Sequence, residues 1–312
     1  MKVVVTGGAG FIGANVVEKL IDRGVEKVVV LDDLSSGYRA NIEGFDVEFH
    51  EGSILDRALL GQVVQGADSV IHLAARPSVP RSIVDPVLSH EVNATGTLYV
   101  LEAARRHGSH VVLASSSSVY GSNPVLPKSE TLRTAPISPY AVSKLATESY
   151  ALAYQAVYDM SVLPFRFFNV YGPLQAPGHA YAAVVPSFIS QALRGQPLTV
   201  HGDGCQTRDF TFVDTVTEAL AISAIKRIAS ASAVNLAFGS RVSLLEVIKL
   251  LEKCLDRRLE VTHSDPRPGD VRDSMADDSL FKSLFPDVVA KPLELGLNET
   301  INWMRSSSFD RN

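Results

Sequence analysis

The sequence is poor in cysteine and tryptophan, and it contains neither a long apolar run nor a run of basic residues. Two cysteines and one tryptophan among 312 residues argue against a disulfide framework. No apolar segment approaches the ~18 residues that a membrane-spanning helix needs. The formal net charge is −5 and no basic cluster occurs. We therefore expect no nucleic-acid partner and no membrane attachment.

The cysteines and histidines indicate the cellular compartment and whether a metal site is expected. Cys205 and Cys254 show no motif spacing, and we interpret them as small buried residues of a reducing compartment. The eight histidines form no metal-binding pattern, so we expect no metal site. The first predicted strand begins at residue 2 or 3, which leaves no room for a signal peptide. These features predict a cytoplasmic protein.

What the sequence does contain is a glycine-rich turn between a strand and a helix. Residues 2–6 form a β-branched run typical of a buried parallel strand, and residues 11–23 have a helical pattern that ends at Gly24. Such a turn lets backbone amides meet a pyrophosphate at the helix N-terminus. A glycine turn without a ligand is the alternative. The candidate cofactor residues are Gly7, Gly10, Phe11, Ile12 and Gly13.

An acidic residue follows at the spacing that a dinucleotide site needs. A second predicted strand, over residues 27–31, ends at Asp32. A carboxylate about 20 residues after the glycines is placed to accept a ribose hydroxyl. Arg39 lies nearby and could accommodate the extra phosphate of NADP. The carboxylate favours NAD.

The first half of the chain alternates short apolar runs with helical stretches. This pattern predicts an α/β fold with a doubly wound parallel sheet of the Rossmann type. The predicted strands are 2–6, 27–31, 46–50, 69–73, 110–115 and 161–167, and the predicted helices are 11–23, 56–64, 93–107 and 140–158. The Gly172-Pro173 break predicts a dinucleotide-binding domain over 1–173 and a smaller α/β substrate lobe over 174–312, with 210–237 partly returning to the first domain.

Segments that contain small residues stand at the ends of two predicted strands. Ser53 and Ile54 come after the third strand, and Leu73, Ala74 and Ala75 end the fourth. Their size would let the backbone lie against a flat cofactor, although ordinary packing at strand ends is the alternative.

Two further segments carry groups suited to chemistry. Residues 115–118 are four serines that directly follow the fifth strand, and Tyr140 and Lys144 lie one turn apart on a helix that starts at Pro139. A lysine ammonium near a tyrosine hydroxyl lowers the tyrosine pKa and yields a phenolic base usable near neutral pH. A Tyr-x-x-x-Lys spacing alone is common on helix surfaces. The glycine turn and Asp32 in the same chain favour the catalytic interpretation.

In these segments the chain resembles the extended short-chain dehydrogenase/reductase family, and more narrowly its nucleotide-sugar 4-epimerases. The resemblance covers nearly the whole chain and rests on TGGAGFIG, HLAA, SSSSVYG, SPYAVSK and RFFNVYGP. It implies Tyr140 as the catalytic base, Lys144 as its tuner and a cofactor ligand, and Ser116 as the hydroxyl on the sugar O4. It also implies NAD in the larger domain, with further contacts from Asp33, Ser35, Ser36 and Gly37.

The same resemblance implies a UDP-sugar in the smaller domain. The implied substrate residues are Ser116, Ser117, Ser118, Tyr140, Asn169, Ala183, Val184, His201, Arg208, Arg267, Asp270 and Ser274. Read alone, Arg208 and Arg267 suit surface positions. Within the resemblance, their forked guanidinium groups suit a diphosphate. The small Ser274 implies room for an N-acetyl group on the sugar, whereas Leu174 and Ala176 replace an arginine and an aspartate common among enzymes that take such sugars.

The implied reaction is inversion at C4 through a 4-keto sugar, on UDP-glucose and UDP-galactose and on UDP-GlcNAc and UDP-GalNAc. Related dehydratases and decarboxylases carry an acidic residue where this chain has Ser117-Ser118, which favours the epimerase. The alternatives are a UDP-glucuronate 4-epimerase, another nucleotide-sugar oxidoreductase or dehydratase, and a non-catalytic NAD-sensing scaffold. Helices 93–107 and 140–158 resemble those of a family dimer interface, so we expect a homodimer. The apolar side of the second helix is formed by Leu145, Ala146 and Leu152, for which a place in the core is the alternative.

Overall fold

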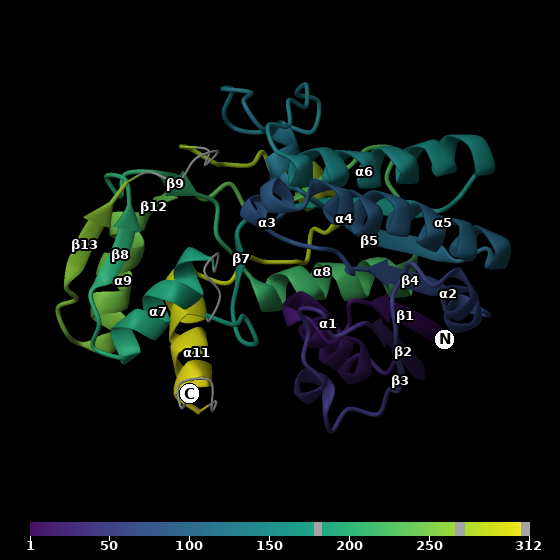
Figure 1. Cartoon of the computed structure of the whole chain (residues 1–312), viewed down its shortest axis with the longest axis horizontal. Coiled ribbons are helices and arrows are strands. Elements are labelled where there is room, and N and C mark those ends of the chain that lie inside the picture. Colours follow the sequence, from purple (N-terminus) through teal and green to yellow (C-terminus); the bar gives the residue numbers. More distant parts are fainter. Residues whose placement is uncertain (178–182, 266–271, 307–312) are drawn as a thin grey trace.

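A parallel sheet between two layers of helices forms the larger of two lobes (Figure 1). The structure, a computed structural model, describes residues 1–177, 183–265 and 272–306. The sheet has the strand order β11-β6-β5-β4-β1-β2-β3 and is parallel throughout. Its strands are β1 (Lys2–Thr6), β2 (Lys27–Asp32), β3 (Glu48–Glu51), β4 (Ser69–His72), β5 (His110–Ser116), β6 (Val162–Phe167) and β11 (Val234–Leu236). The predicted Rossmann-type fold is confirmed.

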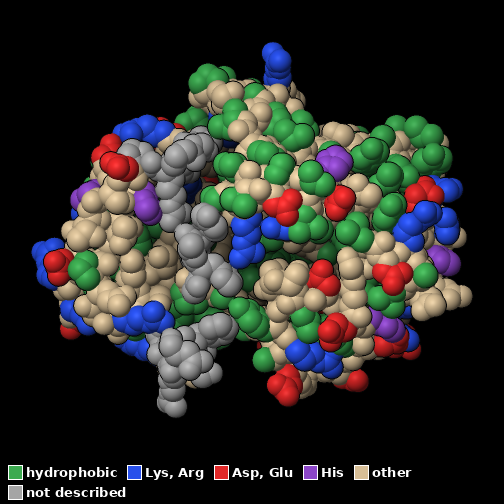
Figure 2. Space-filling model, viewed as in Figure 1, with side chains coloured by type: hydrophobic (Ala, Val, Ile, Leu, Met, Phe, Trp, Pro, Cys, Tyr) green, Lys and Arg blue, Asp and Glu red, His purple; other side chains and the backbone are tan. Residues whose placement is uncertain are grey.

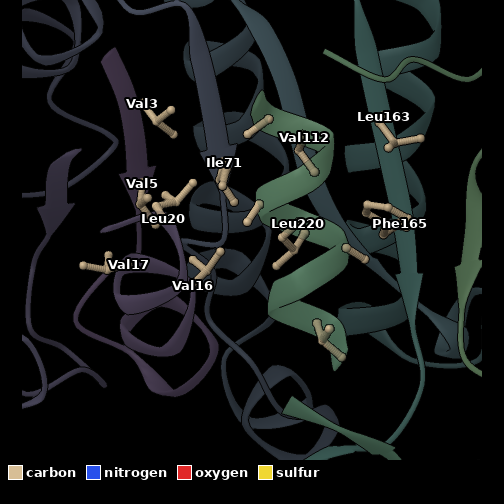
Figure 3. Packing of buried hydrophobic residues seen from close by; sticks show 14 of the residues in the cluster. Val3, Val5, Val16, Val17, Leu20, Ile71, Val112, Leu163, Phe165 and Leu220 are labelled. Carbon is tan, nitrogen blue, oxygen red and sulfur yellow. The ribbon is translucent and has the colours of Figure 1, made fainter. Parts of the chain in front are cut away.

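Both faces of this sheet are covered, which explains its nearly uninterrupted valines and leucines. One face carries α2 (Arg57–Val64), α5 (Gly96–His107) and α6 (Pro139–Tyr158). The other carries α1 (Phe11–Asp22) and α8 (Val213–Lys226). Figure 3 shows side chains of β1, β4, β5 and β6 meeting those of the two latter helices. The chain reverses its direction of winding at β1 and β4, and a crevice for ligands opens there at the carboxyl ends of the strands.

The chain crosses between the lobes more than once. After the first segments of the smaller lobe, α8 returns to pack against α1, and β11 pairs with β6 at the sheet edge. Val234 of β11 lies opposite Phe165 of β6. The division of the chain near Pro173 stays a prediction.

The smaller lobe lies at the left of Figure 1 and has a separate apolar core. Its main elements are α7 (Val184–Leu193), β8 (Leu198–His201), α9 (Leu244–Leu255), β13 (Val261–Ser264) and α11 (Leu293–Ser306). Two short pairs join β7 (Val170–Tyr171) to β10 (Thr211–Phe212) and β9 (Thr207–Arg208) to β12 (Val242–Ser243), and α10 is Ser279–Leu284. Phe188 and Leu251 are among the fully shielded residues of this core.

Some local predictions were wrong. The helix expected from residue 93 starts earlier, as a π-helical turn (Glu91–Thr95) that continues into α5. Two short helices, α3 (Val79–Val84) and α4 (Pro86–His90), were not predicted. The two cysteines are not buried, since Cys205 is exposed and Cys254 is half-buried. Within the described ranges, no helix combines the length and apolar character needed to cross a bilayer.

Candidate active site

The glycine-rich turn presses against the end of β4 and leaves no room for side chains. A Cβ at Gly7, where φ is +73°, would lie 2.6 Å from the backbone nitrogen of Ala74, and a Cβ at Gly13 would collide with the carbonyl oxygen of Gly7. Helix α1 begins after Gly10 without a side-chain cap. Its first backbone N–H groups are therefore available to the oxygens of a pyrophosphate. These features fit a dinucleotide.

Asp32 ends β2 beside this turn and is held by backbone donors. Its carboxylate accepts hydrogen bonds from the backbone nitrogens of Ala9 and Leu34, each at 2.9 Å. Burial raises the pKa of Asp32, and the two backbone hydrogen bonds counter the increase. Arg39, the residue considered for an NADP phosphate, is stacked on the Phe49 ring at 3.9 Å. This arrangement favours a ribose hydroxyl as the partner of Asp32.

We expect Asp32→Ala to weaken NAD binding and to relax discrimination against NADP. Loss of a hydrogen bond to a charged group corresponds to roughly a 10- to 100-fold rise in the dissociation constant. Titration of stripped protein with both cofactors would measure the change, and Asp46→Ala at an exposed loop position provides the control. A wild-type protein that prefers NADP would contradict this interpretation of Asp32.

The first turn of α6 brings the predicted base to the carboxyl end of β5. Ser138 caps the helix by accepting a hydrogen bond from the backbone nitrogen of Ala141 at 3.2 Å, and Pro139 occupies its first turn. The backbone nitrogen of Tyr140 donates to Oγ of Ser82 at 3.0 Å. Lys144 follows one turn later, and its ammonium donates to the carbonyl oxygen of Ala114 at 2.8 Å. Tyr140, Lys144 and Ser116 all line one cavity.

The electrostatics of the tyrosine differ from the prediction. Burial raises the pKa of Tyr140, and a hydrogen bond with Ser116 opposes the increase. Burial also lowers the pKa of Lys144 to about 8. The expected lowering of the Tyr140 pKa by Lys144 is therefore not found: the influence that opposes burial comes from Ser116, and burial prevails.

Most of the predicted site residues meet in a cavity of about 560 Å³ at the sheet end. This volume is within the usual range for a small-molecule site. The predicted residues that line it are Gly7, Gly10, Phe11, Ile12, Gly13, Asp32, Asp33, Ser35, Ser36, Ile54, Leu73, Ala74, Ala75, Ser116, Ser117, Tyr140, Lys144, Asn169 and Ala183.

A second cavity, of about 240 Å³, continues from the first into the smaller lobe. Asn169, Val170 and Ala183 line both cavities. The smaller one also contains three further predicted residues, Val184, His201 and Arg208. Because they share these lining residues, the two cavities lie side by side and extend from the glycine turn to the smaller lobe.

Four predicted residues line neither cavity. Gly37 packs against the backbone of Ala9, and Ser53 accepts a hydrogen bond from the backbone nitrogen of Leu55. Ser118 donates to Oγ of Ser116 at 2.9 Å, so it supports the cavity wall from behind. The backbone nitrogen of Ser274 donates to the carbonyl oxygen of Thr207 at 3.1 Å. Arg267 and Asp270 lie outside the described residues.

Two glutamines were missed by the sequence analysis. Gln175 lines the larger cavity and Gln206 lines the smaller one. The side-chain oxygen of each is shielded from solvent and has no hydrogen-bond partner among the described residues. A shielded acceptor without a partner suits a ligand N–H or O–H. Gln175 follows the Gly172-Pro173 break, a pattern that signals a boundary and not a binding site.

The glycine turn, the ribose-placed carboxylate and the Tyr140–Lys144 pair define a dinucleotide-dependent enzyme of the Rossmann type. The chain matches the model of the NAD dependent epimerase/dehydratase family over residues 3–237, and it belongs to this family. NAD is thus its cofactor, as the sequence predicted. No group of three or more histidine, cysteine, aspartate or glutamate side chains suited to a metal ion occurs within the described residues.

Relatives cover essentially the whole chain. A UDP-glucose 4-epimerase of Mycolicibacterium smegmatis is 36% identical over 315 residues, covering 99% of this chain and 100% of its own length. The structure of a UDP-N-acetylglucosamine 4-epimerase from Methanobrevibacter ruminantium, in complex with UDP-N-acetylmuramic acid, has a TM-score of 0.93 at 35% identity, with 98% of each chain covered. A Thermus thermophilus UDP-glucose 4-epimerase in complex with NAD has a TM-score of 0.89 at 35% identity, covering 98% of this chain and all of its own.

Proposed function

We propose that this protein is an NAD-dependent UDP-hexose 4-epimerase, an isomerase that inverts C4 through a 4-keto sugar. The observation that carries the proposal is that Ser116, Tyr140 and Lys144 line one cavity, which shares lining residues with a second cavity containing Arg208. The first hollow suits the cofactor and the hexose, and the second suits the nucleoside diphosphate. The similarity to relatives named as UDP-sugar 4-epimerases supports the assignment.

The chain's own residues supply the proton chemistry and the orientation. Tyr140 removes the O4 proton when C4 is oxidised and returns it to O4 at the end. Ser116 holds O4 by its hydroxyl, and Arg208 holds the diphosphate while the keto sugar presents its other face. Bound NAD supplies the hydride acceptor and donor together with a positive charge. Because NAD ends each turnover unchanged, we expect it to remain bound to the purified protein.

The acid/base content of the cavity favours epimerisation over the related reactions. The carboxylates that line the larger cavity, among the described residues, are Asp32 and Asp33 at the end of β2. Ser117 lines the same cavity as Tyr140. The family resemblance implies an acidic residue at this place in dehydratases and decarboxylases. A serine hydroxyl is a poor proton shuttle at neutral pH. The reaction that these groups support stops at the ketone.

An assay of the pure protein on UDP-glucose, UDP-GlcNAc and UDP-glucuronate side by side tests the proposal. We expect C4 epimers of the first two sugars to form without added NAD and without net NADH consumption. Net NADH consumption would indicate a reductase, and turnover of UDP-glucuronate alone would favour the glucuronate epimerase. No turnover of any UDP-hexose would leave the NAD-sensing scaffold.

The width of the sugar pocket is testable at Ser274. Ser274 lines neither cavity, but its backbone pairs with Thr207, the residue before Arg208 of the smaller cavity. We expect Ser274→Tyr to abolish turnover of UDP-GlcNAc while UDP-galactose turnover stays within about threefold, because added bulk clashes with the larger 2-substituent. Ser283→Tyr, at an exposed position of α10, is the control. Equal loss of both activities would contradict a role in selectivity.

We propose that the protein forms a homodimer through an apolar surface on α3, α4 and α6 (Figure 2). The exposed apolar residues of this surface are Ile83, Val84, Val87, Leu88, Val142, Tyr150, Val157 and Tyr158. The sequence predicted helix 93–107 as the second helix of this interface, but among the described residues that helix presents no large exposed apolar side chain. Leu145, also expected there, is partly buried and packs beside the buried cluster of Tyr120 and Phe168. We expect Val157→Glu to shift sedimentation from dimer to monomer without changing NAD content. A wild-type monomer at all concentrations would reject the dimer.

We also propose a cytoplasmic location, which the two free cysteines support.

A further inference from the structure

A buried ion pair connects α6, the helix that carries Tyr140, to the strand β6. Glu148 of α6 and Arg166 of β6 form two hydrogen bonds, Nη2 to Oε1 at 2.7 Å and Nε to Oε2 at 3.0 Å. Their side chains are only 4% and 7% exposed. Replacement of such a pair by apolar residues is often neutral for stability, because desolvation of the charges offsets their attraction. Stability alone therefore gives little reason for an ion pair at this place.

Ser115 links this pair to the strand end that carries the active-site serines. Its Oγ donates to Oε2 of Glu148 at 2.7 Å and lies 3.3 Å from the carbonyl oxygen of Lys144. The single hydroxyl proton goes to the carboxylate, since that contact is shorter and charge-assisted. Ser116 is the next residue, so a contact with Glu148 sets where β5 ends relative to α6.

The other side of the pair is also fully engaged. Nη1 of Arg166 donates to the hydroxyl of Tyr120 at 2.9 Å, and that hydroxyl donates to Oδ1 of Asn235 at 2.7 Å. The side-chain nitrogen of Asn235 donates to the carbonyl oxygen of Lys128 at 2.7 Å. Tyr120 ends the turn that follows Ser116. A satisfied network of buried polar groups favours a single arrangement of the segments it joins.

We propose that Ser115 and Glu148 are positioning residues that hold the Ser116 hydroxyl at its working distance from Tyr140. Tyr140, Lys144 and Glu148 follow one another at four-residue intervals and share one face of α6. The Ser115–Glu148 hydrogen bond therefore fixes the strand end against the helix face that carries the base. This role rests on the proposed epimerase function, in which Tyr140 and Ser116 both contact O4. Proton transfer is sensitive to displacements of an ångström or less.

Ser115→Ala is the most direct test, because it removes this hydrogen bond and leaves the charge pair intact. Ser115 lines the larger cavity but not the smaller one, which is proposed for the nucleoside diphosphate. We therefore expect kcat for UDP-galactose to fall about tenfold while KM changes little. We also expect the acidic limb of the kcat profile to move to higher pH. The Ser116 hydrogen bond lowers the pKa of Tyr140, so a looser bond lets that pKa rise.

Ser109→Ala, at the residue directly before the start of β5, is the matched control. Ser109 is buried, and its Oγ donates to the carbonyl oxygen of Ala67 at 2.7 Å, so the variant removes an equivalent hydrogen bond far from the cavity. Its kcat and pH profile should match those of the wild type. Glu148→Gln, and its combination with Ser115→Ala, complete a double-mutant cycle. Because both substitutions remove the same contact, the double variant should lose no more activity than the less active single variant.

Three results would overturn the positioning role. They are a wild-type kcat and pH profile in Ser115→Ala, an equal loss in Ser109→Ala, or single losses that multiply in the double variant. A wild-type protein that turns over no UDP-hexose would overturn the proposed function and the positioning role with it. Wild-type turnover matched by Ser115→Ala would overturn the positioning role alone.

Discussion

Replacing Tyr140 by phenylalanine is expected to lower kcat for UDP-hexose epimerisation by about 10³-fold and to leave NAD bound. General acid–base groups contribute roughly 10²- to 10⁴-fold to the rate of proton transfer. The phenyl ring keeps the size of the side chain, and the backbone hydrogen bond from residue 140 to Ser82 does not depend on the hydroxyl. The variant therefore removes the proton acceptor with little change in packing.

A matched variant on the same helix separates this effect from general damage. Tyr150 lies on the exposed side of α6, away from the residues that line the cavity. Tyr150→Phe should keep wild-type turnover, and both variants should release the same amount of NAD(H) on denaturation. Turnover by Tyr140→Phe within about tenfold of the wild type would rule out Tyr140 as the base.

The second large effect is expected at Gly13. In Gly13→Ala the new methyl group would meet the carbonyl oxygen of Gly7 and lie 2.7 Å from Cα of Gly8, so α1 must move away from the turn. Overpacking of this kind costs about 1–3 kcal/mol of folding stability. The displaced helix N-terminus would no longer face the pyrophosphate. We expect the purified variant to contain no NAD(H) and to unfold at a lower temperature.

Gly61→Ala is the control for this substitution. Gly61 lies within α2, where a Cβ would meet no atom within 4 Å. An alanine in a helix interior stabilises by about 0.5–1 kcal/mol relative to glycine, so this variant should melt slightly higher and keep its NAD. A Gly13→Ala protein with full NAD content would show that the turn tolerates a side chain and does not cradle the phosphates.

Individual strands, the start of the helix that carries Tyr140, and the spacing of Tyr140 and Lys144 could be predicted from the sequence, because each depends on a short-range pattern. The β-branched runs of β1 and β2 identify buried parallel strands. Ser138 and Pro139 mark the start of α6, and the spacing of Tyr140 and Lys144 places both on one helix face. These features need only neighbouring residues, and the structure confirms the elements they predict.

Properties that depend on long-range packing were not predictable in this way. Glu148 and Arg166 are 18 residues apart, and nothing in either local segment indicates that the two pair in the interior. The direction of the Tyr140 pKa follows from burial, which the Tyr140–Lys144 spacing does not report. Likewise, Leu145 belongs to an apolar pattern on α6 that fits a core residue as well as an interface residue, and the structure places it beside the core.

The return of α8 and β11 to the large sheet limits how this chain can be recombined with its relatives. A chimera spliced at Pro173 would import a foreign edge strand and a foreign helix along with the foreign sugar pocket. Leu220 of α8 and Val234 of β11 pack in the same core as Val16 of α1, and a transplanted half would have to match that packing. Grafting a new sugar preference onto this scaffold therefore calls for exchange of individual loops, such as the one around Ser274, rather than of the contiguous C-terminal half.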